Sequence, residues 1–478
     1  MSNLSSRCLH NVVPEETKDF MGRVFGNPWS EDNPNGIFPM GIAENRLMHN
    51  EIAHYINSHI SVTPKMLTYG DGPTGSLALR AALASYIDSY FSAYQKVTKD
   101  HITVLSGGSS LIDGLCYCLA EEGDGILIAR PCYGGFVGDF EDRARVKPVF
   151  VDIGDLSDLT TLAGVRRHEE AILESQRSGI KIKGLLLCNP HNPLGRCYPP
   201  NVIEAYLSLC SKYSIHFISD EIYAMSIFPT SDFQDMVPFT SVLSLDVAKF
   251  IDPGLVHVLY TMSKDFCCNG LRIGALVSQA NPILHSTLAA ISKFAWASSL
   301  SDHVWTLMLT DRSFLDFYFS TFRERMSASY EFCAAMLRER GIEYIPSYAG
   351  PFIWVSLKPF LPGGKHTLEA ERVLSKRMLD NGIWLATGEA FKSETAGWYR
   401  ITFAMSEEDV KFGLARLWKV LGLEENQQTS SCETDKDEKN ASEEGVGGKM
   451  IHVEGNRPNG EAIEVEDKRE TMFDFGNS

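Results

Sequence analysis

Short apolar runs alternate with amphipathic stretches along much of the chain. Each run has the length of a buried strand, and the runs lie near residues 102–105, 125–129, 148–152, 182–188, 214–219, 256–261 and 273–278. Helical periodicity lies between them and resumes over residues 313–340. Because strands alternate with helices, the pattern predicts an α/β fold with a mostly parallel sheet between layers of helices.

The same patterning divides the chain into four expected parts. We predict an N-terminal arm that joins the small domain (residues 1–50), a large domain (51–310), a smaller α+β domain (311–422) and an acidic tail (423–478). Residues 424–478 hold fifteen acidic and six basic residues, a balance of −9 out of the total of −17. Hydrophobic periodicity stops there, which predicts a disordered tail.

Composition excludes several classes of protein. No apolar run reaches membrane-spanning length, and the first twenty residues lack the basic-then-apolar pattern of a signal peptide. The eleven cysteines and thirteen histidines follow no disulfide or metal-ligand spacing, and no basic stripe indicates nucleic acid. We therefore expect a cytoplasmic protein that binds no metal, no membrane and no nucleic acid.

The segment around Lys264 suggests a cofactor site. Thr261 precedes this lysine by three residues and Arg272 follows it by eight. Pyridoxal 5'-phosphate needs a lysine for its aldehyde, together with hydroxyl groups and an arginine for its phosphate. Taken alone, the segment fits an ordinary loop lysine equally well.

Two further segments follow predicted strands. Asp220 comes at the end of one of them, where α/β sheets bind ligands, and its carboxylate could pair with a pyridine nitrogen. Tyr223 and Asn192, the latter in a turn made rigid by two Asn-Pro pairs, could reach the phenolic oxygen of the same ring. A helix cap, a core tyrosine and a plain turn are the simpler interpretations.

Two more segments suggest anion sites. Ser109 and Ser110 stand in a glycine-rich turn between a strand and a helix, where backbone N–H groups can bind a phosphate. Arg400 lies within an apolar, aromatic strand, where a guanidinium needs an anionic partner such as a substrate carboxylate. A structural salt bridge is the alternative for this arginine.

The order of these motifs resembles that of a known family. Gly-Gly-Ser-Ser (107–110), Asn-Pro-His-Asn-Pro-Leu-Gly (189–195), Ser-Asp-Glu-Ile-Tyr-Ala (219–224), Ser-Lys-Asp (263–265) and Trp-Tyr-Arg-Ile (398–401) are similar to class I aminotransferases of the type I pyridoxal-phosphate fold. Met40 to Asn45 adds a likeness to their 1-aminocyclopropane-1-carboxylate (ACC) synthase branch, including fungal ACC-synthase-like proteins. The resemblance covers roughly residues 15–422.

The resemblance implies a role for each matched residue. Lys264 would hold the cofactor and move the substrate α-proton, Asp220 would pair with the pyridinium, and Arg400 and Glu44 would bind the substrate. Tyr69 would reach the phosphate in the neighbouring subunit, so the resemblance implies a homodimer. The remaining cofactor contacts that it implies are the stacking Tyr133, the oxygen-binding Asn192 and Tyr223, and the phosphate-binding Ser109, Ser110, Thr261 and Arg272.

The chain also departs from the ACC synthase pattern. The segment after the lysine reads Phe266-Cys267-Cys268-Asn269-Gly270-Leu271-Arg272, and an arginine is absent from Gly135-Phe136-Val137-Gly138-Asp139. Because these segments shape the substrate pocket, S-adenosylmethionine does not follow as the substrate. Cys267 and Cys268 are expected to pack in the pocket wall rather than to carry redox chemistry.

Three reactions share the same first steps, an external aldimine and then a quinonoid. Aminotransferase chemistry on an α-amino acid asks for the fewest specialised residues, so it is the expected activity, in a biosynthetic pathway for which secondary metabolism is one option. A C–S lyase or an ACC-synthase-type cyclisation is the alternative. An inactive paralogue that binds partners through its tail is a third interpretation, which Lys264 and Asp220 argue against.

Overall fold

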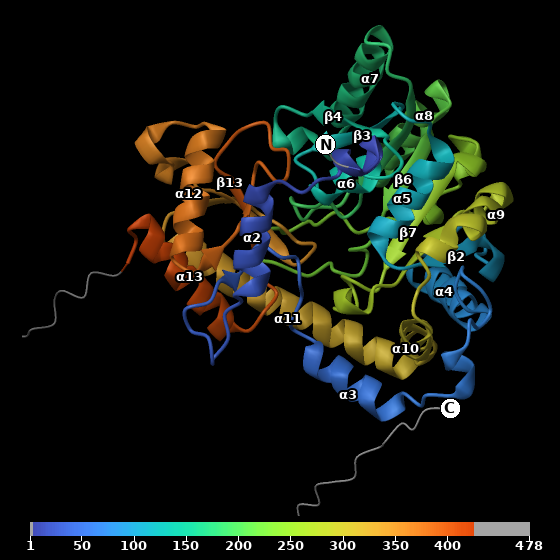
Figure 1. The fold of residues 1–478 in the computed structure, drawn as a ribbon, viewed down its shortest axis with the longest axis horizontal. Helices are drawn as coiled ribbons and strands as arrows, with labels where there is room; N and C mark the ends of the chain where they lie inside the picture. Colours follow the sequence, from blue (N-terminus) through green and yellow to red (C-terminus); the bar gives the residue numbers. More distant parts are fainter. Residues whose placement is uncertain (1–2, 425–478) are drawn as a thin grey trace, which may run out of the picture. The chain divides into compact units, whose positions relative to one another are not determined.

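The computed structural model describes residues 3–424, and its centre is a seven-stranded sheet (Figure 1). The strand order is β2-β8-β7-β6-β5-β3-β4. Only β8 runs antiparallel to its neighbours, which confirms the expected mostly parallel sheet. The bounds are β2 Ile102–Leu105, β3 Gly125–Arg130, β4 Lys147–Asp152, β5 Ile182–Cys188, β6 His216–Asp220, β7 Val256–Thr261 and β8 Gly274–Val277.

Apolar side chains on both faces explain why this sheet lies inside the molecule. All six residues of β7 are buried. Val258 and Tyr260 belong to one hydrophobic cluster, whereas Leu259, which points to the opposite face of the sheet, belongs to a second cluster. Helices α5, α6 and α9 supply apolar residues to the cluster of Leu259, and α4, α8 and α10 supply them to the cluster of Val258. The helices therefore cover both faces of the sheet, as the sequence predicted.

A second sheet follows in the chain and is antiparallel throughout. Its order is β12-β13-β10-β9, and a separate parallel pair joins β1 to β11. The pairing of Phe38 with Ile383 brings the N-terminal part of the chain beside its C-terminal part. The bounds are β1 Phe38–Pro39, β9 Glu343–Ile345, β10 Phe352–Ser356, β11 Ile383–Trp384, β12 Ala386–Thr387 and β13 Trp398–Thr402.

Thirteen α-helices complete the described part of the chain. The longest, α11, closely matches the helical pattern expected over residues 313–340. The bounds are α1 Ser6–His10, α2 Glu15–Gly26, α3 His49–His59, α4 Leu77–Tyr90, α5 Gly108–Leu119, α6 Gly135–Glu141, α7 Leu162–Arg177, α8 Pro200–Tyr213, α9 Pro282–Ile291, α10 Ser299–Thr310, α11 Arg312–Glu339, α12 Leu368–Asp380 and α13 Glu407–Leu421.

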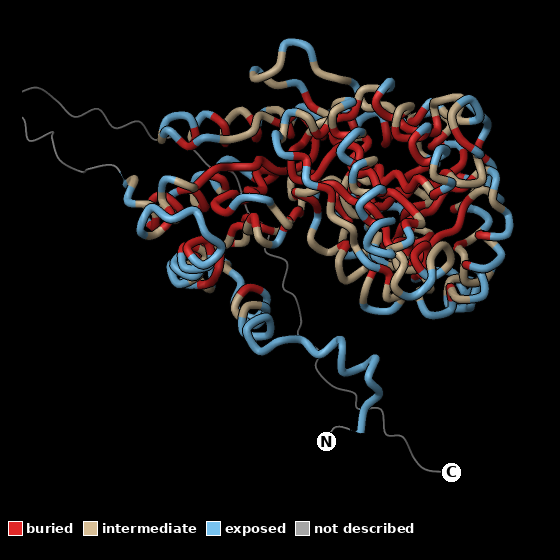
Figure 2. Tube along the Cα trace, turned by 90° about the horizontal axis from the view of Figure 1, so that it is seen from above, coloured by how far each residue is buried: buried red, intermediate tan, exposed pale blue. Residues whose placement is uncertain are grey.

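Burial separates the N-terminal helices from the rest of the molecule (Figure 2). Helix α1 has no buried residue, and α2 buries only Val24. Two contacts still hold α2 in place: Arg23 pairs with Asp380 at 2.8 Å, and the rings of Phe20 and Trp384 meet edge to face. Helix α2 is therefore attached to the segment around β11.

Residues up to Glu424 form one compact unit, so the expected division into an arm, a large domain and a small domain stays a prediction. The predicted acidic tail lies outside the described residues.

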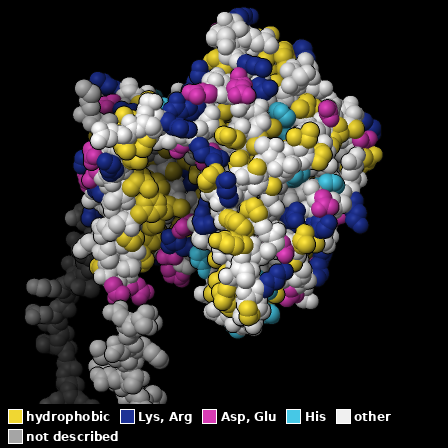
Figure 3. Space-filling model, turned by 45° about the vertical axis from the view of Figure 1, so that its right-hand side comes forward, with side chains coloured by type: hydrophobic (Ala, Val, Ile, Leu, Met, Phe, Trp, Pro, Cys, Tyr) yellow, Lys and Arg dark blue, Asp and Glu magenta, His cyan; other side chains and the backbone are white. Residues whose placement is uncertain are grey.

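Within residues 3–424 no helix is long and apolar enough to cross a membrane, and no group of acidic, histidine or cysteine side chains could hold a metal ion. On the face drawn in Figure 3, basic side chains are scattered among acidic and hydrophobic ones.

Candidate active site

A cavity of about 360 Å³ lies at the carboxyl ends of the central strands. Cys188, Asp220 and Thr261 are the last residues of β5, β6 and β7, and all three line the cavity. Parallel strands bring these ends to one edge of the sheet, which is where α/β proteins bind ligands. Asp220 thus belongs to the end of its strand, within a residue of the position that the sequence indicated.

Asp220 is a buried carboxylate with unused hydrogen-bonding capacity. It is 3% exposed, and its Oδ1 has no hydrogen-bond partner among the described residues. Burial raises the pKa of this carboxyl group to about 7. A carboxylate in this position needs a cation to stay ionised, and the protonated nitrogen of a pyridine ring meets that need.

Lys264 lines the same cavity, just beyond the end of β7. Its Nζ donates a hydrogen bond to the carbonyl oxygen of Ala43 at 2.7 Å. Burial, together with the positive charge of Arg400, lowers the pKa of the amine to about 8. An amine with such a pKa is neutral often enough near pH 7 to attack an aldehyde.

The start of α5 forms an anion site with two neighbouring side chains. Gly107, at φ +95°, turns the chain into the helix, and a Cβ there would lie 2.7 Å from the Nη2 atom of Arg272. The guanidinium therefore packs directly against the backbone of this turn. Ser109 and Thr261 line the cavity beside it, and this combination of groups suits a phosphate.

Two residues expected at the phosphate do not line this cavity. Ser110 shares a hydrogen bond with the hydroxyl of Ser106 at 3.0 Å, because its position in the helix turns it away from Ser109. Tyr69 is 82% exposed, and its ring packs against Trp296 beside a second hollow. Its expected contact to a partner subunit stays a prediction.

Arg400 lies in the middle of β13 and is 4% exposed. Its Nη1 donates to Oδ1 of Asn192 at 3.0 Å and its Nη2 donates to the carbonyl of Gly41 at 2.6 Å, while Nε has no partner. The rings of Phe352 and Phe391 flank the guanidinium. No carboxylate of the described chain pairs with it, so the alternative of a structural salt bridge finds no support within residues 3–424.

Glu44 lies next to the cavity wall rather than in it. Its Oε1 accepts a hydrogen bond from the side-chain amide of Asn269 at 2.9 Å, and Asn269 itself lines the cavity. Arg46 lies 3.9 Å from the other carboxylate oxygen.

Tyr133, Asn192 and Tyr223 all line the cavity, as the sequence indicated.

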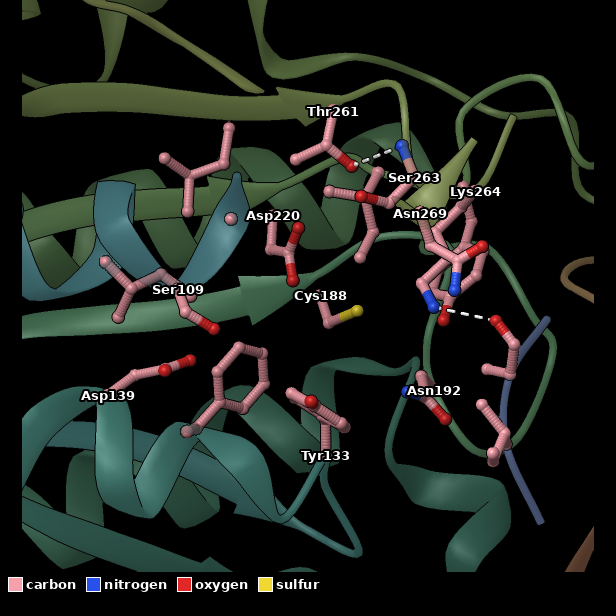
Figure 4. Close-up of a pocket in the computed structure, with 18 of the residues that line it drawn as sticks. Ser109, Tyr133, Asp139, Cys188, Asn192, Asp220, Thr261, Ser263, Lys264 and Asn269 are labelled. Atoms are coloured by element: carbon pink, nitrogen blue, oxygen red, sulfur yellow. Dashed lines mark hydrogen bonds between the residues drawn. The ribbon is translucent and has the colours of Figure 1, made fainter. Parts of the chain in front are cut away.

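The structure also brings in residues that sequence reasoning did not select. Asp139 faces the same space as Ser109 and Asp220 (Figure 4), and burial raises the pKa of its carboxyl group to about 6. Phe25 and Trp384 come to the cavity from α2 and β11, which no motif marked. Asp139 lies in α6, within the segment 135–139, which stood out in the sequence only for its missing arginine.

Cys267 and Cys268 correct one expectation. Both are buried members of the large hydrophobic core and neither lines the cavity. Cys267 accepts a hydrogen bond from the hydroxyl of Tyr318, and burial raises the pKa of both thiols. Asn269 and Arg272, further along the same segment, line the cavity instead.

The residues present fit pyridoxal 5'-phosphate. An amine of lowered pKa, a buried carboxylate and an anion site at a helix start surround one cavity, at the places that an aldehyde, a ring nitrogen and a phosphate require. The fold and the site thus define an enzyme that uses this cofactor.

Comparison with known proteins places the chain in a family. The family described as aminotransferase class I and II matches residues 39–417. A probable aminotransferase, sirI, of Leptosphaeria maculans is 32% identical over 428 residues, covering 88% of this chain and 98% of the relative. The human 1-aminocyclopropane-1-carboxylate synthase-like protein 1 is 33% identical over 402 residues, covering 82% and 78%.

Solved structures agree with this fold. Aspartate aminotransferase from Thermus thermophilus with maleate has a TM-score of 0.69 at 20% identity, covering 88% of this chain and 100% of its own. Kynurenine aminotransferase from Pyrococcus horikoshii has a TM-score of 0.68 at 19% identity, covering 88% and 97%. The chain belongs to the class I and II aminotransferases, which depend on pyridoxal 5'-phosphate, and the expected family, fold class and cofactor are confirmed.

Proposed function

We propose that the protein is a cytoplasmic homodimer that moves the amino group of an α-amino acid to a 2-oxo acid in a biosynthetic, secondary-metabolite pathway. One observation carries the proposal. The backbone of residues 41–43 bonds to the arginine at Gly41 and to the lysine at Ala43, so a carboxylate site and an amine lie on either side of one short segment. That spacing suits the carboxylate and the α-carbon of one amino acid.

Pyridoxal 5'-phosphate supplies an aldehyde that bonds to amines and a ring that accepts electrons from the substrate α-carbon. Asp220 would hold the ring nitrogen in its protonated state, because a buried carboxylate favours a cation beside it. Ser109, Thr261 and Arg272 would hold the phosphate, and Tyr133 would stack on the ring. Asn192 and Tyr223 would bind the phenolic oxygen.

Lys264 would serve twice. Its Nζ would hold the cofactor aldehyde, and as a free amine it would be the base placed to take the proton from the substrate α-carbon. The hydrogen bond to Ala43 O gives this amine a defined position when it is free. For transamination the same Nζ would also act as the acid that gives this proton back.

Arg400 would bind the substrate carboxylate through two parallel N–H bonds. Its unpaired Nε shows capacity for a further acceptor, and Nη2 can exchange the neutral carbonyl of Gly41 for an anion. Glu44, held by Asn269, would lie near the substrate amino group. The guanidinium is already fixed between two rings, so little entropy is lost on binding.

The dimer is supported by exposed apolar side chains around Tyr69. Leu67 is 77% exposed and lies two residues from it, and Phe294, two residues from the stacked Trp296, is 74% exposed. A second subunit would cover these side chains and bring Tyr69 toward its phosphate site.

Elimination of a sulfur substituent, or an ACC-synthase-type cyclisation, is the second candidate. The specific observation in its favour is the carboxylate of Glu44, which the ACC synthase resemblance places near the substrate amino group and side chain. The relatives named as ACC-synthase-like proteins support the same reading. Lys264, Asp220 and Arg400 would serve either outcome.

One experiment separates these outcomes. The purified protein, loaded with cofactor, is incubated with a panel of amino acids and cysteine conjugates, with and without a 2-oxo acid, and products are identified by mass spectrometry. We expect a new amino acid that forms only when the 2-oxo acid is present. Ammonia with a 2-oxo acid and a thiol would instead identify the lyase, and no product from any member of the panel would contradict both candidates.

A further inference from the structure

We infer that the substrate side chain is large, apolar and uncharged, with an aromatic ring as its best representative. The inference rests on the proposed function, because it assigns the part of the same cavity that the cofactor and the substrate carboxylate leave open. Three apolar side chains form that part: the exposed Phe25 and the partly buried Ile42 and Trp384. We call them the apolar wall.

The position of the wall follows from the backbone of residues 41–43. Gly41 accepts a hydrogen bond from Arg400 and Ala43 accepts one from Lys264, so Ile42 lies between the carboxylate site and the amine. Ile42 itself lines the cavity. An α-carbon held between those two groups therefore has its side chain next to Ile42.

Trp384 stands directly beside this segment. A Cβ on Gly41 would lie 3.0 Å from Cδ2 of Trp384, so the indole packs against the backbone at that glycine. The same Cβ would lie 2.7 Å from Ala386 N and 3.0 Å from the carbonyl carbon of Leu385. A larger residue at position 41 would therefore clash with the backbone of residues 385–386 as well as with the indole.

Phe25 is the more exposed part of the wall, and it is not needed to attach its helix. Helix α2 is held by the buried Val24, by the ring contact of Phe20 and by the ion pair of Arg23. Phe25 remains 55% exposed while lining the cavity. Apolar surface left open at the mouth of a cavity gains from being covered by an apolar ligand.

The charges of the cavity argue against an acidic side chain. Three cations line it, and each already has a proposed partner: Lys264 the aldehyde, Arg272 the phosphate and Arg400 the α-carboxylate. No other lysine or arginine of residues 3–424 lines this cavity. A second carboxylate on the substrate would thus be desolvated against hydrocarbon without a cation from this subunit.

Carboxylic acids that lack the amino group test the wall without any turnover. We would measure by calorimetry the dissociation constants of 3-phenylpropionate, propionate and glutarate on the cofactor-loaded protein. The expected order is 3-phenylpropionate tightest, with at least tenfold weaker binding of the other two. Glutarate binding tighter than 3-phenylpropionate would overturn the inference. This outcome includes the case in which a partner subunit supplies a cation for the second carboxylate of glutarate.

Substitutions then locate the effect. Phe25→Ala and Trp384→Leu should each reduce the preference for 3-phenylpropionate over propionate by about tenfold. Phe317→Ala is the matched control, because Phe317 is 53% exposed and lies on α11 away from the cavity lining, and it should leave the preference unchanged. An unchanged preference in both wall variants would overturn the inference. Failure of all amino acids to react would contradict the proposed function while leaving this binding order intact.

Discussion

The two sides of the cavity are built in opposite ways. The cofactor side is mostly polar and stands at the ends of strands β5, β6 and β7, where Asp220 is only 3% exposed and Thr261 is buried as well. The substrate side combines Arg400 with the apolar wall, whose members come from α2, from the segment after β1 and from β11. One side is held by a single sheet, and the other is assembled from segments more than 300 residues apart.

This difference shows how rigidity is distributed in the site. The cofactor side is fixed by backbone hydrogen bonds between neighbouring strands, such as the pairing of Cys188 with Asp220. On the substrate side Arg400 and Trp384 also lie in strands, but helix α2, which brings Phe25, relies on side-chain contacts such as Arg23 with Asp380 and Phe20 with Trp384. Changes on the cofactor side should therefore abolish chemistry, whereas changes on the substrate side should alter selectivity.

The largest effect is expected for Lys264→Ala. The variant should lose the yellow colour of the bound cofactor and all measurable turnover while remaining folded, because no other lysine lines the cavity within the described residues. Absorbance, circular dichroism and activity would check this. Lys181→Ala, at an exposed lysine, is the matched control. Borohydride fixing the cofactor to another lysine would refute the assignment.

Asp220→Asn should have the next largest effect. An amide does not favour a positive ring nitrogen as a carboxylate does, so kcat should fall on the order of 1000-fold while the cofactor is retained. Asp155→Asn, at an exposed helix cap, provides the comparison. Near-normal turnover in Asp220→Asn would mean that Asp220 serves only the local structure.

Arg400→Lys tests the substrate side. An ammonium cannot form two parallel bonds to a carboxylate, so KM for the amino acid should rise roughly 100-fold, about 2.7 kcal/mol, with little change in cofactor affinity. Steady-state kinetics and cofactor titration would separate the two quantities. Arg372→Lys, at an exposed ion pair with Glu389, should change neither. Loss of cofactor binding would place Arg400 on the cofactor side instead.

The smallest effect concerns pH. Because burial lowers the pKa of Lys264 to about 8, its neutral amine becomes abundant as pH rises through 8 rather than through the ordinary value of 10.5. Capture of the cofactor by cofactor-free protein should therefore accelerate about tenfold per pH unit below 8 and then level off. Stopped-flow absorbance would follow it, with N-α-acetyl-lysine as reference. A rate still rising at about pH 10 would contradict the lowered pKa.

The sequence predicted the cofactor side better than the substrate side, for a physical reason. Lys264 and Asp220 each lie at, or just beyond, the end of a strand, together with neighbours in sequence that line the same cavity. A short sequence motif therefore corresponds to a group of side chains that are close in space. Phe25 and Trp384 line one cavity although they are more than 300 residues apart, and the pairings that bring their segments together, such as Phe38 with Ile383, are encoded by no local pattern. Ser110 shows the limit on the cofactor side, since one step along a helix turns a side chain away from the cavity.

The carbonyl groups of Gly41 and Ala43 act as stand-ins for the substrate. They accept hydrogen bonds from the guanidinium of Arg400 and from the amine of Lys264, so both groups have a hydrogen-bond acceptor before any ligand binds. A zwitterion replaces one of these neutral acceptors with an anion, whereas a simple amine or alcohol offers no better acceptor than the one already there. Before the cofactor binds, the site would therefore favour anions over small uncharged molecules, which would leave both backbone contacts in place.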